Sequence, residues 1–238
     1  MKTAIIVGAS SGIGRELAKI LSAKGFQLGL VARRIDLLVD LEKKLPHPSR
    51  AVQMDVAEIT TTRQSMKGLI ADLGTVDLVV ISAGTGHLNP ELEFSKESDT
   101  IATNVVGFTA VANVAFKHFL HKRSGHLVGI SSIAALRGDG EAPAYNASKA
   151  FVSNYLEGLR KKAVKSGFPI AVTDIRPGFV DTDMAKGEGQ FWVAPPQKAA
   201  KQIYSAIAKK KKQAYITRRW KIVGGLLKIM PAFLYDRL

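Results

Sequence analysis

The chain has 238 residues, 46% of them hydrophobic, which suffices to bury the core of one large domain. The absence of cysteine from the sequence excludes disulfides and cysteine metal ligands, and it fits a reducing, cytoplasmic environment. The formal net charge is +14, and +8 of it falls after Ala208, where nine Lys or Arg residues outnumber the single acidic residue, Asp236.

Short apolar runs alternate with helical patterns from the start of the chain. Residues 1–7 are too short an apolar run for a secretory signal and are interpreted as a buried strand, followed by a helix over 13–21 and a strand over 26–31. Near-continuously apolar strands of this kind are typical of a parallel sheet covered on both faces. We therefore expect an α/β fold, with one doubly wound, Rossmann-type domain over 1–217 and a parallel sheet of about seven strands. Residues 218–238 are expected to form a basic amphipathic helical tail, which is not an independent domain.

A glycine-rich loop joins the first expected strand to the first helix. Its candidate cofactor-binding residues are Gly8, Ser10, Ser11, Gly12, Ile13 and Gly14. Glycine is needed where the backbone turns tightly and where a pyrophosphate approaches main-chain N–H groups, and the helix N-terminus adds a favourable partial charge. Between a strand and a helix, such a loop indicates a dinucleotide site.

Two arginines, Arg33 and Arg34, follow the second expected strand, where a dinucleotide domain selects its ribose. A guanidinium fork suits the 2′-phosphate of NADP, whereas an acidic residue would bind a free 2′-hydroxyl. Two solvated arginines at a helix start, with Asp36 close by, are the simpler interpretation. We expect NADP(H) as the preferred cofactor, with NAD(H) as the alternative.

The ends of the next two strands supply further candidates for the cofactor site. The third expected strand, over 50–54, ends at Asp55 and Val56. Asp55 is a candidate partner of the adenine amino group, or alternatively a cap for the helix that follows. The fourth strand enters a turn of small residues that includes Ala83 and Gly84, which would let a cofactor lie close to the backbone.

Asn104 lies near the start of a long apolar helix expected over 105–120. A mid-helix asparagine usually bonds to solvent or backbone, but beside a catalytic tyrosine it can hold a water that relays protons. His118 and His121 share the far end of this helix without evident carboxylate partners. We therefore expect no metal site there.

Tyr145 and Lys149 are four residues apart in an expected helix, so their side chains share one face. A nearby ammonium group favours phenolate, so Lys149 is expected to lower the pKa of Tyr145 and make it a general acid or base near neutral pH. Ser132, where the preceding strand ends, is expected to hold a substrate oxygen, with Ser131 as the second choice. On its own, the tyrosine–lysine spacing is common on solvated helices.

The sixth expected strand, over 170–175, leads into Pro177, Gly178 and Thr182 at the sheet edge where ligands gather. Thr182 is a candidate contact of a nicotinamide carboxamide. Residues 184–196 are interpreted as a substrate lid. The helices that carry Asn104 and Lys149 have more apolar surface than one contact requires, which predicts a homodimer or homotetramer.

In this order and at these separations, the motifs resemble those of classical short-chain dehydrogenases/reductases over residues 1–217. The matching segments are 8–14, Asp55-Val56, Ala83-Gly84, Asn104-Val105, Ser132, 145–149, and Pro177-Gly178 with Thr182. Two positions depart from the family pattern: Val7 stands where a threonine is usual, and Ser82 where an asparagine is usual. Both departures concern the local geometry of the sheet and its loops.

The resemblance implies a catalytic tetrad of Asn104, Ser132, Tyr145 and Lys149. Tyr145 would be the acid or base, and Ser132 would hold the substrate oxygen. Lys149 would bind the nicotinamide ribose while lowering the tyrosine pKa, and Asn104 would anchor a relay water. Hydride would pass directly between nicotinamide and substrate, without a metal.

The tail, residues 218–238, has apolar residues at helical spacing, with Trp220 and Phe233 at either end and basic residues among them. Such a segment can lie in an anionic membrane interface, but its charges and Pro231 prevent it from spanning one. A helix that covers the substrate pocket or packs on a partner subunit is the slightly favoured alternative. The lysine run over 209–212 fits a helix C-terminus better than a nucleic-acid site.

The sequence thus predicts an NADP(H)-dependent oxidoreductase that interconverts a carbonyl and a secondary alcohol, with a small-molecule substrate of hydrophobic or lipid-like character. The alternative is a dinucleotide-binding sensor or scaffold without turnover, and the intact set of catalytic side chains argues against it. We expect a cytoplasmic protein, with the tail as a candidate for peripheral membrane contact, and no nucleic-acid partner.

Overall fold

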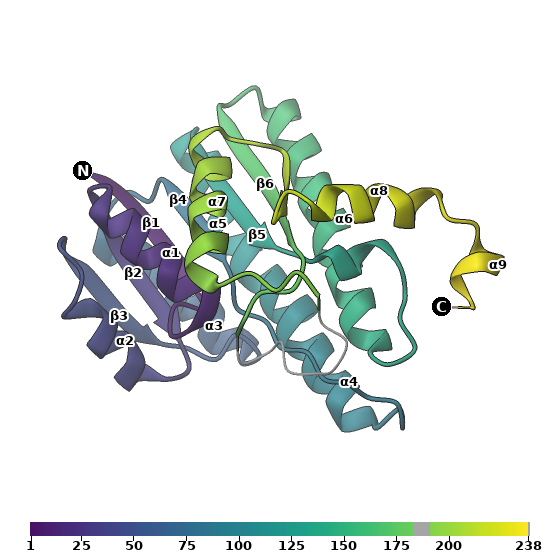
Figure 1. Cartoon of the computed structure of the whole chain (residues 1–238). Helices are drawn as coiled ribbons and strands as arrows, with labels where there is room; N and C mark the ends of the chain where they lie inside the picture. The colour runs from purple at the N-terminus through teal and green to yellow at the C-terminus, as the bar shows by residue number, and fades with distance from the viewer. Residues whose placement is uncertain (183–190, 238) are drawn as a thin grey trace.

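Seven parallel strands form the centre of the molecule, in the order β3-β2-β1-β4-β5-β6-β7 (Figure 1). The computed structural model describes residues 1–182 and 191–237. The strands are β1 Lys2–Val7, β2 Phe26–Ala32, β3 Ser49–Gln53, β4 Leu78–Ile81, β5 Gly125–Ile130, β6 Ile170–Pro177 and β7 Gln213–Ile216. The α/β fold and the single parallel sheet expected from the sequence are confirmed.

Helices cover both faces of this sheet. Their bounds are α1 Gly12–Ala23, α2 Ile35–Glu42, α3 Ile59–Leu73, α4 Phe94–Ile101, α5 Phe108–Lys122, α6 Pro143–Ser166, α7 Pro196–Ala208, α8 Trp220–Ile229 and α9 Ala232–Tyr235. One hydrophobic core joins α1, α2 and α7 to the sheet, and the other joins α3, α5 and α6. The described part of the chain is therefore a three-layer structure.

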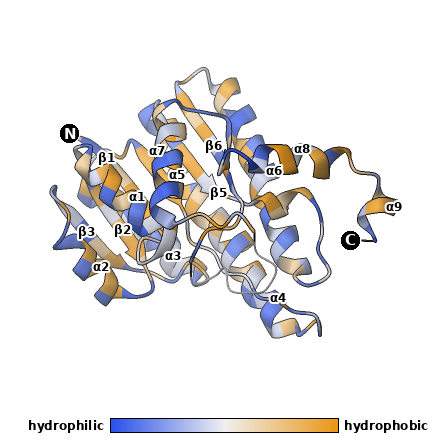
Figure 2. Cartoon of the chain, in the orientation of Figure 1, coloured by the Kyte–Doolittle hydropathy of each residue, from blue (hydrophilic) through white to orange (hydrophobic). Residues whose placement is uncertain are grey.

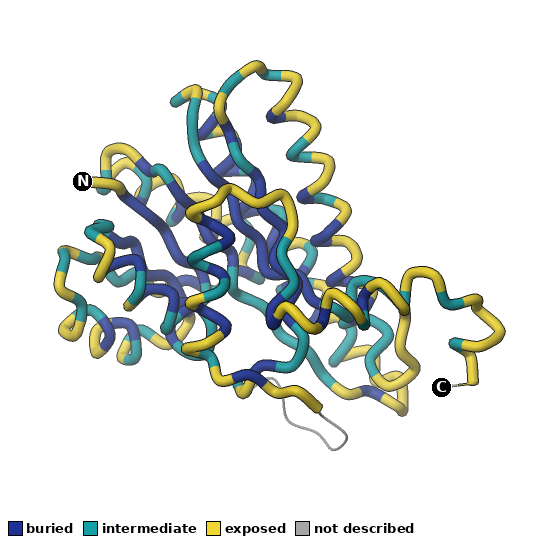
Figure 3. The backbone as a smooth tube through the Cα atoms, turned by 45° about the horizontal axis from the view of Figure 1, so that its top comes forward, coloured by how far each residue is buried: buried dark blue, intermediate teal, exposed yellow. Residues whose placement is uncertain are grey.

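The alternation of side chains along β1 shows why its sequence is apolar throughout. Ala4 and Ile6 belong to the first core, whereas Ile5 and Val7 belong to the second, and all four are almost fully buried. Successive side chains of a strand point to opposite faces, so a sheet covered on both sides requires apolar residues at every position. Figure 2 shows this hydrophobic centre, and Figure 3 shows its burial.

The strand order reverses at the centre of the sheet. Strand β1 pairs with β2 on one side and with β4 on the other. In open α/β sheets the crevice at such a switch point, outside the carboxyl ends of the strands, is where ligands bind. The carbonyl of Val7 accepts hydrogen bonds from the backbone N–H groups of Ser82 and Ala83, each at 2.8 Å. The two loops at the switch point are thus joined by main-chain bonds, despite the unusual residues at Val7 and Ser82.

The region before α5 differs from the sequence prediction. The helical segment begins at Phe94 with α4 and passes through a π-helical stretch, Ala102–Gly107, before α5. The sequence analysis placed a helix start near Val105 because α4 has almost no apolar face: of its residues, only Thr100 is buried. Of the expected lid, residues 184–190 lie outside the described residues, and α7 begins at Pro196.

The last two helices, α8 and α9, follow β7 and project from one end of the molecule (Figure 1). Much of their surface is exposed to solvent (Figure 3). Within residues 1–182 and 191–237, every helix is too short or too polar to cross a membrane.

Candidate active site

The candidate residues follow the carboxyl ends of β1, β4, β5 and β6, which lie at one edge of the sheet. The glycine loop follows β1, and its packing leaves no room for side chains. A Cβ on Gly8 would lie 2.4 Å from the Ala83 backbone nitrogen, and one on Gly14 would lie 2.1 Å from the Gly8 carbonyl oxygen. Gly8 also has a φ of +91°, which favours glycine.

Helix α1 opens directly from this loop, and no side chain caps its N-terminus. The first backbone N–H groups of a helix have no partner within the helix, and the helix dipole adds positive character to them. An uncapped N-terminus behind a loop of glycines therefore fits a pyrophosphate group. This arrangement agrees with the cofactor site expected over residues 8–14.

The two arginines after β2 have different environments. The Arg34 guanidinium donates to the hydroxyl oxygens of Ser11, at 2.8 Å, and of Ser10, at 3.3 Å. Arg33 instead points at Asp55, with 3.9 Å between its Nη1 and the carboxylate Oδ2. Only Arg34 is hydrogen-bonded to the glycine loop, where a phosphate on the ribose would add negative charge.

Asp55 lies in the turn before α3, whose N-cap residue is Glu58. Its Oδ1 accepts from the Ala57 backbone N–H at 3.0 Å, and its carbonyl accepts from the Thr62 hydroxyl at 2.8 Å. The neighbouring Val56 is buried, and its carbonyl lies so close to Gly107 that a Cβ there would approach to 2.6 Å. The Asp55 side chain therefore stabilises this turn and does not cap α3, and its contact with adenine stays a prediction.

Asn104 is buried inside the π-helical segment. Its Oδ1 accepts from the Thr85 backbone N–H at 2.9 Å, and its Nδ2 donates to the Thr85 carbonyl at 2.7 Å and to the Ser148 hydroxyl at 2.9 Å. The asparagine thereby joins the loop after β4 to α6. Single π-turns inside helices occur frequently at functional sites, and no sequence pattern had indicated the one here.

Lys149 is 5% exposed, and its ammonium group donates to the Ile130 carbonyl at 3.3 Å. A Cβ on Gly84 would lie 3.2 Å from this Nζ and 3.1 Å from the Asn104 Oδ1. A side chain at this position of the turn would crowd the lysine and the asparagine. Burial lowers the pKa of Lys149 from 10.5 to about 8, and the Asp174 carboxylate partly opposes this effect.

Tyr145 lies one helical turn before Lys149 on α6. Burial raises the pKa of the Tyr145 phenol, and a hydrogen bond with the Ser132 hydroxyl acts in the opposite direction. The Lys149 ammonium lies over the ring, 5.5 Å from its centroid. The sequence analysis expected the lysine to lower the tyrosine pKa. That direction is wrong for this arrangement, because desolvation of the phenolate is the largest effect.

The two adjacent serines after β5 point to different partners. The Ser131 hydroxyl donates to the Asp174 carboxylate and to the Ile175 carbonyl, the latter at 3.0 Å. The Ser132 hydroxyl accepts from the Ala134 backbone N–H at 3.1 Å and reaches the Tyr145 phenol. Ser132, the first choice from the sequence, is therefore the one beside the tyrosine.

A buried charged network behind the site escaped the sequence analysis. Asp174 accepts from Ser153 at 2.7 Å and from the Arg176 Nε at 2.8 Å, in addition to Ser131. The side chains of Asp174 and Arg176 are only 1% and 10% exposed. Their i, i+2 spacing on β6 puts both on one face of the sheet, and two opposite charges at that spacing in an apolar strand are a signal that sequence reasoning can use.

The segments after β6 and β7 meet at the same edge. Thr182 covers the glycine loop: its Cγ2 lies 3.0 Å from where a Cβ on Gly12 would be. Trp220, at the start of α8, packs on Gly178 so closely that a Cβ there would lie 2.1 Å from the indole. Thr182 was expected near the cofactor, and a tail helix that covers the substrate pocket was one of the expectations for residues 218–238. Pro177 precedes Gly178, and its carbonyl lies 3.5 Å from the Ser132 hydroxyl oxygen.

A recess beside Tyr145 is lined by loop and helix residues that include His87, Asn89 and Lys96. The His87 Nε2 lies 2.8 Å from the Asp99 carboxylate. His87 therefore lies at the rim of the recess that Tyr145 also lines.

Comparison with known proteins identifies the family of this chain. A family model described as short chain dehydrogenase matches residues 2–191. The chain belongs to the short-chain dehydrogenase family. An uncharacterized oxidoreductase of Myxococcus xanthus is 36% identical over 188 residues, which cover 77% of this chain and 74% of the relative. Membership of the family makes this chain an oxidoreductase.

Solved structures of short-chain dehydrogenases agree with the fold. A short-chain dehydrogenase from Streptomyces avermitilis is 26% identical, covers 90% of this chain and 88% of its own, and has a TM-score of 0.81. A short-chain dehydrogenase from Sphingobium yanoikuyae in complex with NADPH has the same TM-score of 0.81 at 20% identity and covers 98% of this chain and 97% of its own. At that low identity, the second likeness concerns the fold alone.

Proposed function

We propose that this short-chain dehydrogenase uses NADP(H) to interconvert a carbonyl compound and the corresponding secondary alcohol. The observation that carries the proposal is the meeting of Tyr145 and Ser132 with Lys149 and Asn104 at the switch-point edge, beside Gly84. The nicotinamide, when bound, supplies or accepts the hydride. The protein then has to position the substrate oxygen and move one proton.

Each of the four polar side chains has a part in this chemistry. The Tyr145 hydroxyl donates a proton to the substrate oxygen during reduction and accepts it during oxidation. The Ser132 hydroxyl, which already bonds to the phenol, holds that oxygen in place. Lys149 would hold the nicotinamide ribose, and Asn104 fixes the loop at Thr85 and anchors a relay water.

NADP(H) is favoured over NAD(H) by the position of Arg34. Its guanidinium bonds to two serine hydroxyls of the glycine loop, so a fixed positive charge stands beside the phosphate-binding turn. The other proposed cofactor contacts are those of the glycine loop, of Asp55 and Val56, and of Pro177, Gly178 and Thr182. The fold of the NADPH complex from Sphingobium yanoikuyae is in keeping with this proposal.

The substrate is proposed to be hydrophobic, because aromatic side chains gather beside Gly178. Phe179, Phe191, Trp192 and Trp220 pack edge to face or tilted, with ring centroids 5.1 to 6.1 Å apart. We also propose a cytoplasmic homodimer or homotetramer that uses α5 and α6. On α6, Phe151 is 37% exposed and stacks on Tyr155 at 5.6 Å, which leaves an apolar surface for a second subunit.

The cofactor proposal is tested by fluorescence titration of NADPH and NADH. The Arg34→Ala variant should lose at least about tenfold in NADPH affinity, with little change for NADH, because a charge-assisted contact is removed. Arg33→Ala is the matched control, since Arg33 pairs with Asp55, and should change NADPH affinity much less. Equal affinity of the wild type for both cofactors would contradict the NADP(H) preference.

The catalytic proposal is tested with Tyr145→Phe in an assay of NADPH consumption over a panel of hydrophobic ketones and aldehydes. Turnover should fall by about 10²–10⁴-fold while NADPH affinity is retained. A Tyr145→Phe protein that kept full biological effect would instead support the sensor or scaffold alternative.

A further inference from the structure

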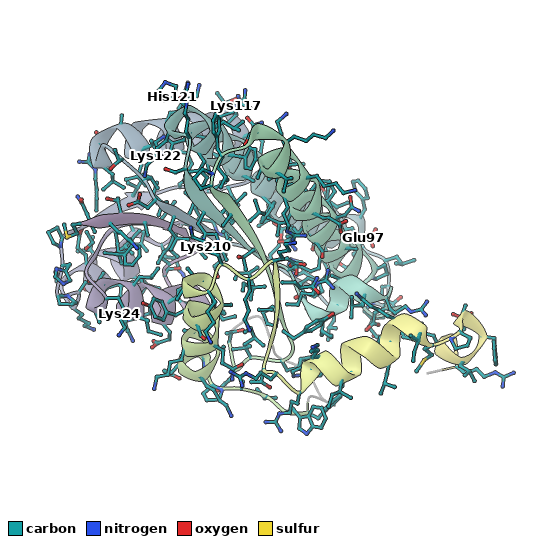
Figure 4. The ribbon with its side chains drawn as sticks, turned by 90° about the horizontal axis from the view of Figure 1, so that it is seen from above. Lys24, Glu97, Lys117, His121, Lys122 and Lys210 are labelled. Atoms are coloured by element: carbon teal, nitrogen blue, oxygen red, sulfur yellow. The ribbon has the colours of Figure 1, made fainter. Side chains whose placement is uncertain are left out.

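The helices α8 and α9 expose an apolar face that no other segment within residues 1–182 and 191–237 covers. Its exposed fractions are large: Ile222 69%, Leu226 55%, Ile229 78%, Phe233 63% and Leu234 46%. The first three recur every three or four residues, so they form one stripe along α8. Figure 2 shows the hydrophobic character of α8, and Figure 4 shows the helix running away from the sheet.

The opposite face of α8 is firmly attached to the domain. Gly224 packs so closely on Tyr215, Ile133 and Leu136 that a Cβ would lie 2.8 to 3.1 Å from these side chains. Arg137 donates to the Leu227 carbonyl at 2.9 Å and to the carbonyl of Met230, at the end of the helix. The exposed stripe is therefore held in a fixed orientation, pointing outward.

Further contacts attach the two ends of this segment. Trp220 is 3% exposed and packs on Gly178 and Phe179. Near the chain end, the Tyr235 hydroxyl donates to the Gly138 carbonyl at 2.6 Å, and the Arg137 guanidinium lies over the Tyr235 ring at 5.4 Å. Both α8 and α9 are thus docked on the loop that follows Ser132.

Basic side chains border the apolar stripe. Residues 218–238 contain five basic residues and one acidic residue, Asp236. The basic residues are Arg218, Arg219, Lys221, Lys228 and Arg237, and all are exposed. Arg219 lies over the exposed Trp192 ring, 5.2 Å from its centroid, so an aromatic side chain continues the stripe toward the active site.

We propose that α8 and α9 dock on an anionic lipid bilayer, lying in the interface with the stripe Ile222, Leu226 and Ile229 inserted. A short helix with exposed Leu and Ile on one side, flanking Lys and Arg, and aromatic residues near its ends matches what anionic interfaces bind. Because basic residues outnumber the single acidic residue in this segment, electrostatic attraction favours a negatively charged surface.

A second copy of this chain fits the same face less well. A two-fold interface brings the same patch from both copies together, so five basic side chains from each copy would gather there with only one acidic residue, Asp236, per copy. Like charges placed together at an interface oppose association, and interface cores are depleted of Lys. An anionic bilayer attracts these basic side chains and involves no such repulsion.

Docking in this orientation would bring the mouth of the site to the bilayer. The loop on which α8 packs follows Ser132 directly, and Trp220 at the start of α8 touches Gly178. The inserted helix therefore adjoins both sides of the proposed substrate position. This consequence, a substrate taken from the membrane, rests on the proposed function. Bilayer binding itself does not, so the two can fail separately.

The test is co-sedimentation of the full chain with vesicles of phosphatidylcholine containing phosphatidylglycerol, and with pure phosphatidylcholine vesicles. We expect binding to the anionic vesicles that weakens with added salt, and little binding to the neutral ones. Ile222→Ser/Leu226→Ser/Ile229→Ser should lower the partition coefficient at least about thirtyfold. Val164→Ser, at a 77% exposed apolar residue on α6, is the matched control and should bind like the wild type.

Charge-reversal variants distinguish the contribution of residues 218–238 to bilayer binding from that of the lysine run over 209–212. Lys221→Glu/Lys228→Glu should lose binding, whereas Lys209→Glu/Lys211→Glu should retain it. Circular dichroism and thermal unfolding, measured on every variant, report that the domain is folded. Failure of the wild type to bind anionic vesicles, or equal binding by the serine variant, would overturn the proposal. So would a serine variant whose only change is a smaller oligomer by light scattering, since that outcome assigns the stripe to a second copy.

Discussion

The Lys149 ammonium nitrogen lies 5.5 Å from the ring centroid of Tyr145, over the face of the phenol. Burial acts on both groups: it lowers the pKa of Lys149 to about 8 and raises the pKa of Tyr145. Each shift disfavours the charged form of the group. Near neutral pH the phenol is protonated in both the folded and the unfolded state, so only the lysine shift lowers folding stability there.

Replacement of Lys149 by methionine should stabilise the protein at neutral pH. The unfolded lysine takes up its proton below pH 10.5 and the folded one only below about 8, so the folded state is penalised most below pH 8, and the penalty fades as pH rises toward 10.5. Lys149→Met should therefore gain roughly 3 kcal/mol at pH 7 and less at pH 9.5. Urea unfolding at both pH values measures this, and a loss of stability at pH 7 would contradict it.

Substitution of the two adjacent serines should affect different properties, turnover for Ser132 and stability for Ser131. Ser132→Ala removes the hydroxyl that bonds to the Tyr145 phenol, and turnover should fall by about 10²-fold with NADPH affinity unchanged. Ser131→Ala removes a bond to Asp174 and should cost roughly 1–2 kcal/mol of stability, with turnover largely retained. Steady-state kinetics and urea unfolding of both variants distinguish the roles. The reverse pattern would make Ser131 the substrate-binding residue.

Asp174→Asn should destabilise the protein by about 3 kcal/mol, because it leaves the buried Arg176 guanidinium without its counter-ion. It should also lower the pKa of Lys149 further, since the Asp174 carboxylate raises it. Asp174→Asn/Arg176→Gln removes both charges and should recover part of the stability. Thermal unfolding gives the first result, and NMR titration of the Lys149 ammonium gives the second. An unchanged lysine titration would show that the network does not act on the site.

His126 should make the protein sensitive to acid. Burial lowers its pKa from 6.5 to about 4, with a smaller contribution from Lys210, and its Nε2 lies 2.8 Å from the Thr173 hydroxyl. As pH falls from 6.5 to 4 the unfolded histidine gains a proton and the folded one does not, so stability should fall by up to roughly 3 kcal/mol. The variant His126→Gln should flatten this dependence in unfolding at pH 4.5 and 7. His121→Gln, at an exposed position on α5 (Figure 4), should leave it unchanged.

The sequence alone determined the fold class, and it predicted which side chains meet at the candidate site. The apolar runs over 26–31 and 170–175, separated by helices, predicted a parallel sheet because strands buried on both faces need apolar residues at every position. The glycine loop and the i, i+4 spacing of Tyr145 and Lys149 predicted where the chemistry lies, since both depend on local backbone geometry. Each of these features depends only on residues that are close together in the sequence.

The tertiary structure decided what depends on contacts between distant segments. Desolvation of Tyr145 and Lys149 comes from packing around them, so the spacing alone gave the wrong direction for the tyrosine pKa. The partnership of Ser131 with Asp174 joins strands that are 43 residues apart in sequence, and the docking of α8 on Arg137 spans 90 residues. Burial and long-range hydrogen bonds are properties of the folded chain, and no local pattern of residues encodes them.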